Sequence, residues 1–178
     1  MDRVNLLRRH RWWLLPELVA VVIVGTALIY ANAHGLDDEM SERAQAVLEQ
    51  QSPADLELFS TLHGHGIPEP ERVLCVAEAF GSDPADPESI GQVRVIYARY
   101  LCALVQKGTP WDYATRSSGP AVITLTNPPT VQLARSGTGY RERVKAIFPD
   151  ELEAKALAGF NDRGRPNSLL ARYRVAAS

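Results

Sequence analysis

The chain has 178 residues, with 19 Lys and Arg against 21 Asp and Glu, and only two cysteines. This nearly neutral balance argues against nucleic-acid binding, which depends on clustered Lys and Arg that neutralise phosphates. The length allows one domain with its own hydrophobic core besides a terminal segment, and no cofactor motif is found, so no cofactor is expected.

Residues 12–31, WWLLPELVAVVIVGTALIYA, form an almost wholly apolar run. As a helix rising about 1.5 Å per residue, the run would cover roughly 30 Å, the thickness of a bilayer's hydrocarbon core. Four arginines precede it and three acidic residues follow it, which predicts a cytoplasmic N-terminus. We therefore expect a cytoplasmic tail over 1–11 and a single transmembrane helix over 12–31. The protein would lie in the plasma membrane of a bacterial cell envelope, with its C-terminal domain outside the cytoplasm.

A cleaved signal peptide is the alternative interpretation of this segment. The basic start, the apolar core and the small residues of Ala31-Asn32-Ala33 all fit it. The length of the apolar run and the two tryptophans at its start favour a retained anchor. Both interpretations send the remaining chain into an oxidising compartment.

The segment after the anchor has helical character. Asp37 or Asp38 can cap a helix that runs to about Gln51, which predicts a juxtamembrane helical segment over 32–52. An extracytoplasmic α+β domain is then expected over 53–178.

A second helix is expected to start at Ser52, with Pro53 in its first turn and Asp55 as a weak capping-box partner. An apolar stripe follows, and Gly64 would end this helix.

Two stretches rich in β-branched and aromatic residues, 72–81 and 93–106, predict an antiparallel hairpin. If Cys75 lies opposite Cys102, the oxidising compartment and the lack of another partner predict a disulfide. Two buried thiols, or a helix over 72–80 ending at Gly81, are the alternatives. The same register pairs Glu78 with Arg99, Phe80 with Tyr97, Val76 with Leu101 and Val73 with Leu104.

A second hairpin is expected from strands over 121–126 and 130–135, joined by a loop with two prolines. Helices are expected over 140–148, 150–157 and 168–177, although the last segment could also be an edge strand. The predicted fold is α+β: a single transmembrane helix followed by an antiparallel sheet of about four strands, in two hairpins, covered by helices. In the second hairpin the predicted register places Leu125 opposite Val131 and Ile123 opposite Leu133.

Trp111, Asp112 and Tyr113 form a candidate contact surface in the connection between the two hairpins. Aromatic residues in a polar loop are enriched at interfaces, although such a tryptophan more often covers the end of a core. The expected partner is another envelope protein or a cell-wall component.

Three further groups favour structural explanations. His63 and His65, with Glu69 and Glu71 nearby, could hold a metal, but their spacing matches no regular metal motif. The turn over 136–139 precedes a helix but lacks the Lys-Ser/Thr of a phosphate-binding loop. The Glu78–Arg99 pair is expected to be structural.

No catalytic constellation and no motif specific to a family is found in the sequence. The expected function is a non-enzymatic binding module on a membrane anchor. The alternative is an extracytoplasmic hydrolase or metal-dependent enzyme that uses His63, His65, Glu69 or Asp112.

Overall fold

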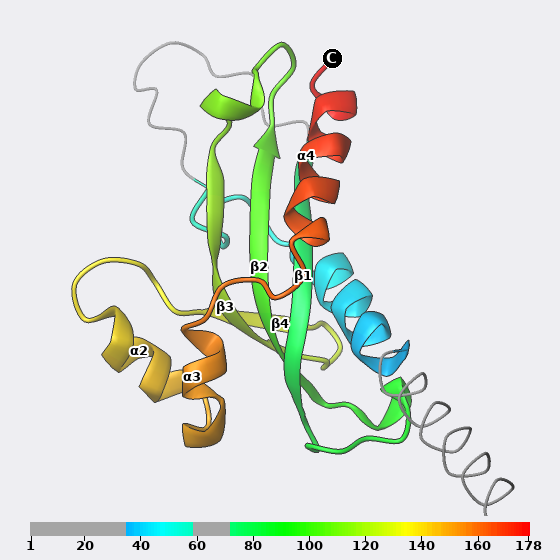
Figure 1. Ribbon diagram of the computed structural model, residues 1–178, viewed down its shortest axis with the longest axis vertical. Helices are drawn as coiled ribbons and strands as arrows, with labels where there is room; N and C mark the ends of the chain where they lie inside the picture. The colour runs from blue at the N-terminus through cyan, green and yellow to red at the C-terminus, as the bar shows by residue number, and fades with distance from the viewer. Residues whose placement is uncertain (1–34, 59–71) are drawn as a thin grey trace, which may run out of the picture. The chain divides into compact units, whose positions relative to one another are not determined.

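The computed structural model describes residues 35–58 and 72–178, of which residues 37–178 belong to one compact unit (Figure 1). Residues 35–49 are helical, and the rest of the unit is an antiparallel sheet with helices packed on it. The further elements are, in chain order, β1 (Arg72–Asp83), η1 (Ile90–Gln92), β2 (Val95–Val105), η2 (Trp111–Tyr113), β3 (Arg116–Thr124), β4 (Thr130–Leu133), α2 (Tyr140–Ile147), η3 (Asp150–Leu152), α3 (Glu153–Ala156) and α4 (Gly164–Ala176).

The sheet has four strands in the order β1-β2-β3-β4, and every neighbouring pair is antiparallel. Each strand therefore pairs with the next one along the chain, which keeps the connections short. The predicted α+β class with a four-stranded antiparallel sheet is confirmed.

The first hairpin has the predicted register over most of its length. Cys75 lies opposite Cys102 and Glu78 opposite Arg99, so the alternative of a helix over 72–80 is wrong. The predicted pairing of Phe80 with Tyr97 is also wrong: a β-bulge between Ala79 and Gly81 places Gly81 opposite Tyr97.

Glycine at position 81 leaves room for a neighbouring side chain. A Cβ atom there would lie 2.9 Å from Cδ1 of Leu152, which packs against this end of the sheet. The bulge therefore coincides with the point where η3 approaches the strand.

The second hairpin is shifted by two residues from the predicted register. Ile123, rather than Leu125, lies opposite Val131, and Ala121 lies opposite Leu133. Because the shift is even, the same side chains stay on the same face. The connection is longer than expected because β3 already ends at Thr124. Leu125, just beyond that end, donates its N–H to the carbonyl of Arg94 at 2.8 Å.

β3 begins at Arg116, five positions before the predicted Ala121. The intervening Ser-Ser-Gly-Pro has the composition of a loop, so the sequence did not indicate this part of the strand. Pro120 is tolerated opposite Arg99 because its backbone nitrogen points away from β2, beyond the end of β4.

The prediction of a second helix starting at Ser52 is wrong over the residues that the structure describes. Residues 53–57 form a turn in which Glu57 has a left-handed backbone with φ 57°. The backbone N–H of Asp55 still donates to Ser52 Oγ at 3.2 Å, as in the expected cap. The predicted end at Gly64 lies outside the described residues.

The C-terminal helices agree with the expectation. α2 spans Tyr140–Ile147, and the segment expected over 150–157 is split into η3 and the short α3. The last segment is the helix α4 rather than an edge strand, and it begins at Gly164, earlier than predicted.

The predicted membrane helix over 12–31 lies outside the described residues. Within residues 35–58 and 72–178, no helix has both the length and the apolar character needed to cross a membrane.

Candidate functional site

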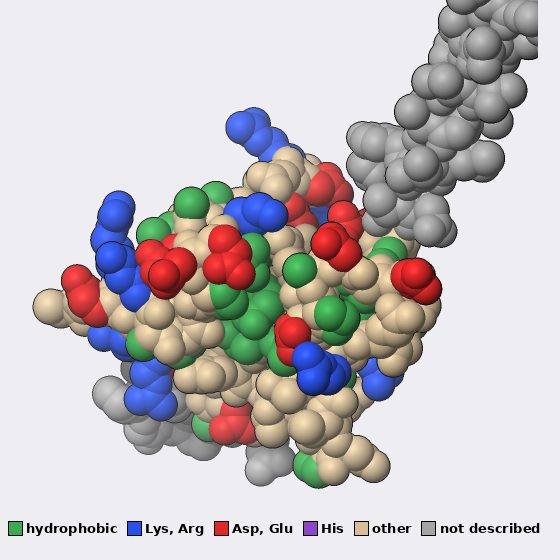
Figure 2. All heavy atoms as spheres, turned by 90° about the horizontal axis from the view of Figure 1, so that it is seen from below, with side chains coloured by type: hydrophobic (Ala, Val, Ile, Leu, Met, Phe, Trp, Pro, Cys, Tyr) green, Lys and Arg blue, Asp and Glu red, His purple; other side chains and the backbone are tan. Residues whose placement is uncertain are grey.

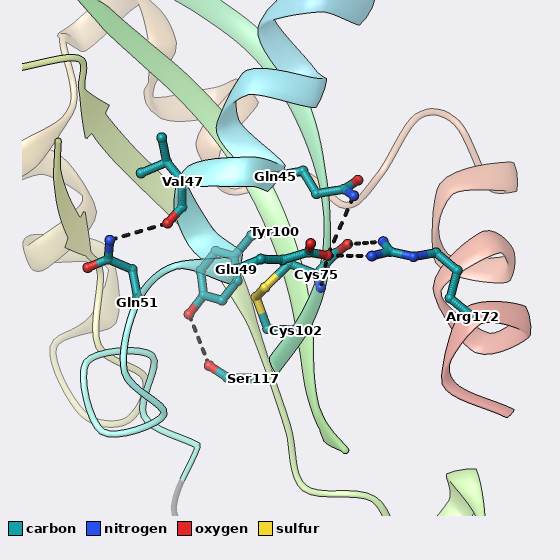
Figure 3. Close-up of a disulfide and its surroundings, with 9 residues drawn as sticks. All are labelled: Gln45, Val47, Glu49, Gln51, Cys75, Tyr100, Cys102, Ser117 and Arg172. Atoms are coloured by element: carbon teal, nitrogen blue, oxygen red, sulfur yellow. Dashed lines mark hydrogen bonds and ion pairs between the residues drawn. A yellow bond between two sulfur atoms is a disulfide. The ribbon is translucent and has the colours of Figure 1, made fainter. Parts of the chain in front are cut away.

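The outer edge of β1 is closed by side chains from two helices. A disulfide joins Cys75 to Cys102, and both residues are fully buried, so the alternative of two free thiols is wrong. The backbone N–H of Cys75 donates to Oε1 of Glu49 at 2.9 Å, and its carbonyl accepts from Arg172 at 2.8 Å. Glu49 and Arg172 also form an ion pair at 2.6 Å, so the two side chains bracket Cys75 (Figure 3).

The same arrangement continues along β1. The Oγ of Ser41 accepts from the N–H of Ala79 at 2.9 Å, and Arg165 of α4 donates to the carbonyl of Ala77 at 3.1 Å. Strand edges with unpaired backbone groups attract other strands. Here the protein's own side chains bond the N–H and carbonyl of Cys75, the carbonyl of Ala77 and the N–H of Ala79, so the middle of the β1 edge is closed.

One face of the sheet carries two separate hydrophobic clusters. The first, under α4, includes Leu74, Val76, Leu169 and Tyr173. The second lies under α2 and α3. Its buried members and the aromatic residues packed on them are Ala134, Val144, Phe148, Ala156, Phe80, Tyr97 and Tyr140.

The ion pair of Glu78 and Arg99 belongs to this same face, by strand alternation, with Arg99 Nη1 lying 3.3 Å from Glu78 Oε1. Arg99 also donates to the carbonyls of Lys155 and Ala158 at 2.8 and 3.0 Å. The carboxylate of Glu78 accepts from the backbone N–H of Asn161 at 2.9 Å. The pair therefore holds the chain between α3 and α4 against the sheet.

Burial lowers the pKa of Arg99, and the neighbouring Glu78 acts in the opposite direction. The side chains are only 5% and 11% exposed, and their remaining polar atoms bond to backbone groups. The expectation that the pair is structural agrees with this geometry.

The connection between β2 and β3 contains the predicted contact residues. Trp111 packs on the first hydrophobic cluster, with its ring 5.2 Å from that of Tyr173 in an edge-on arrangement. The guanidinium of Arg116 lies 4.9 Å from the centroid of the Trp111 ring. Trp111 thus covers the end of the core, as the alternative interpretation has it.

Asp112 and Tyr113 are exposed, and Tyr113 retains 81% of its surface. The turn is held by hydrogen bonds from the N–H groups of Tyr113 and Ala114 to the carbonyls of Pro110 and Trp111, at 3.0 and 3.1 Å. The structure therefore presents Tyr113 to solvent on a fixed support. Its role as a contact residue stays a prediction.

The glycine-rich turn over 136–139 is built around Arg143. The guanidinium donates to the carbonyls of Arg135, Ser136, Gly137 and Thr138, at distances between 2.7 and 3.2 Å. The turn is thus organised around a cation of the protein itself. A plain structural turn was the expected role.

The predicted metal candidates His63, His65, Glu69 and Glu71 lie outside the described residues. Over the described ranges, no three His, Cys, Asp or Glu residues come together in a group that could hold a metal ion. Asp112 is exposed on its turn and belongs to no such group.

The connection between β1 and β2 lies at the end of the domain opposite η2. Seen from this end, hydrophobic side chains gather at the centre and charged side chains, many of them acidic, surround them (Figure 2). Burial raises the pKa of Tyr97, and the nearby carboxylates of Asp83 and Glu151 raise it further. Arg94 pairs with Asp83 at 3.0 Å, so the acidic side chains here are partly compensated.

Three further tyrosines of the described core have raised pKa values. Burial is the main cause for Tyr100, Tyr140 and Tyr173, while the hydrogen bond between Tyr100 and Ser117 Oγ at 3.0 Å partly opposes the shift.

These shifts predict that the protein loses stability in alkali. A pKa raised in the folded state stabilises the fold below the unfolded-state value of about 10, and the stabilisation is lost as the pH rises through the folded value. The free energy of unfolding should therefore fall above about pH 10. Urea unfolding at a series of pH values, followed together with tyrosinate absorbance, measures the slope.

The variant Tyr100→Phe provides the control for this prediction. It should show a shallower fall in stability with pH than the unchanged protein, because one shifted group is gone. Equal slopes in the two proteins would contradict the assignment to Tyr100.

Comparison of the chain with models of protein families, with curated proteins and with solved structures found no significant match.

Proposed function

We propose that the protein is a single-pass membrane-anchored component of a bacterial cell envelope, whose domain outside the cytoplasm acts as a non-enzymatic interaction module. The observation that carries the proposal is the buried Cys75–Cys102 disulfide. Disulfides form and persist in oxidising compartments, whereas cytosolic thiols are kept reduced. The apolar run over 12–31, with arginines before it, supplies a route to that compartment.

The proposed contact surface centres on Tyr113, together with the neighbouring Asp112. Interfaces draw much of their binding energy from a few aromatic anchors, and an anchor binds better when it is already ordered. Tyr113 meets both conditions, because it is 81% exposed and sits on a turn that Trp111 fixes to the core.

The localisation is tested by membrane fractionation and protease treatment of cells whose outer layer has been opened. We expect the full chain to stay in the membrane after an alkaline carbonate wash, and a C-terminal tag to be digested while the inner membrane is intact. Intact-mass measurement of the same material shows whether the chain is cleaved after Ala33. A tag that resists protease until the inner membrane is lysed would contradict the proposal.

The contact surface is tested by substituting Tyr113 and comparing partner recovery after mild cross-linking in native membranes. Tyr113→Ala should weaken recovery about tenfold or more, as expected for an interface anchor. Val175→Ala is the matched control, since Val175 is also a large hydrophobic residue with 78% exposure. If both variants recover the partner equally well, Tyr113 is not the anchor.

A further inference from the structure

The outer edge of β3 is paired along only part of its length. β2 pairs with β3 from Arg116 to Thr124, whereas β4 pairs only with residues 121–124. Figure 1 shows β4 beside the half of β3 that lies farther from η2. Among the described residues, no strand continues β4 along the first half of β3.

Hydrogen-bond directions identify which groups this edge offers. The N–H of Leu104 in β2 donates to the carbonyl of Thr115 at 2.9 Å, so the backbone of Thr115 faces β2. Backbone groups alternate in direction along a strand, so those of Arg116 and Ser118 point away from β2. Within the described ranges, no hydrogen bond is made to the outward N–H or carbonyl of either residue.

The open edge is short and has a definite end. Pro120 is the next outward residue, and it has no N–H to offer. The edge therefore fits only a short extended segment. In the middle of β1, by contrast, edge groups of Cys75 and Ala79 are bonded to the side chains of Glu49, Arg172 and Ser41.

The β2–β3 connection and the first residue of β3 together carry two basic side chains and one acidic side chain. The basic residues Lys107 and Arg116 lie at the two ends of the β2–β3 connection, and both are exposed. Asp112 is the acidic residue of the same connection. An extended ligand with carboxylates would be complementary to these groups, and Tyr113 lies three positions before the start of the edge.

We propose that the β3 edge at Arg116 and Ser118 binds an extended, acidic segment of a partner protein by strand addition. In this mode, backbone hydrogen bonds give affinity and the flanking side chains give specificity. The inference deepens the proposed function, because it names the chemistry of the partner segment.

The first test uses the purified full chain in detergent and two synthetic peptides of about eight residues, long enough for one strand. One peptide alternates glutamate with valine and the other alternates lysine with valine. We expect the glutamate peptide to bind at least tenfold more tightly, and Arg116→Ala to reduce that difference. Equal binding of the two peptides would overturn the acidic preference.

The strand-addition geometry is tested at Ser118. Ser118→Pro removes an outward N–H, and Ser118→Ala removes only the hydroxyl, so the proline variant should bind the glutamate peptide about fivefold to tenfold more weakly than the alanine variant. Equal binding by the two variants would overturn strand addition. Their urea unfolding curves report whether both are folded. If the proline variant is not, the charge reversal Arg116→Glu takes its place and should abolish the preference for glutamate.

The source of the segment is tested with a photo-cross-linking amino acid at position 118 of the full chain in native membranes. Cross-linked peptides from another protein that are acidic and alternate in hydrophobicity support the proposal. Cross-links only to a second copy of this chain would overturn it in favour of self-association. The peptide titrations do not depend on where the protein resides, so their failure can be told apart from failure of the membrane proposal.

Discussion

Replacing Arg99 by methionine should lower the free energy of unfolding by about 3–5 kcal/mol. The change would leave the buried carboxylate of Glu78 without its cation, and it would free the carbonyls of Lys155 and Ala158 that Arg99 now satisfies. It would also remove the guanidinium that lies 4.9 Å from the Phe80 ring. Urea unfolding monitored by circular dichroism measures the loss.

Arg94→Met is the matched control for this prediction. Arg94 also pairs with a carboxylate, Asp83, but its side chain is 73% exposed, so solvent screens the interaction. The control should lose less than about 1 kcal/mol. Similar losses in the two variants would show that the burial of the Glu78–Arg99 pair has no energetic consequence.

The double variant Glu78→Gln with Arg99→Met separates the charge from the contacts. It removes the uncompensated carboxylate, so part of the stability lost in Arg99→Met should return. The unmet carbonyls of Lys155 and Ala158 remain in both variants, so recovery should be incomplete.

Removing the disulfide should cost about 3.5 kcal/mol, the chain-entropy estimate for a loop of this length. The two cysteines are 27 positions apart, and the double variant Cys75→Ala with Cys102→Ala lacks the constraint on the unfolded chain. The free energy of unfolding is measured with and without a reducing agent.

The reducing agent provides the internal control. Both cysteines are fully buried, so a reducing agent should cleave the disulfide only in unfolded molecules. The unchanged protein should therefore show a lower free energy of unfolding when the reducing agent is present during unfolding. The double alanine variant should be insensitive to it. If the variant is as stable as the oxidised protein, the disulfide makes no net contribution.

The first hairpin could be predicted from the sequence because its information is local. Two β-rich stretches with one cysteine each define a register, and that register pairs Glu78 with Arg99 without further assumption. The bulge beside Gly81 was missed because the side chain that packs there, Leu152, comes from a distant part of the chain. The register predicted for the second hairpin was off by two residues because a loop containing prolines does not by itself fix where pairing begins.

The side-chain contacts that close β1 could not be read from the sequence. Glu49 and Arg172 are separated by 123 positions, and neither has a local pattern that indicates the other. Arg143 likewise resembles an ordinary helical arginine, although it organises the turn before α2. Such contacts depend on how the helices dock on the sheet, which hydrophobic periodicity does not specify.

The contact residues were predictable only in part. An aromatic pair in a polar connection indicated a surface, but the sequence could not separate the residue that supports the turn from the one that projects. The structure makes that division, with Trp111 packed on the core and Tyr113 exposed. The half of β3 that β4 does not pair with could not be predicted as a strand because Ser-Ser-Gly-Pro has the composition of a loop.

The redox state of the two cysteines in the cell tests the central claim most directly. Cells are quenched in acid, the protein is denatured with an alkylating reagent before and after reduction, and its intact mass is measured. The account predicts no alkylation of Cys75 or Cys102 before reduction and alkylation of both after it. Complete alkylation of both cysteines without reduction would contradict it.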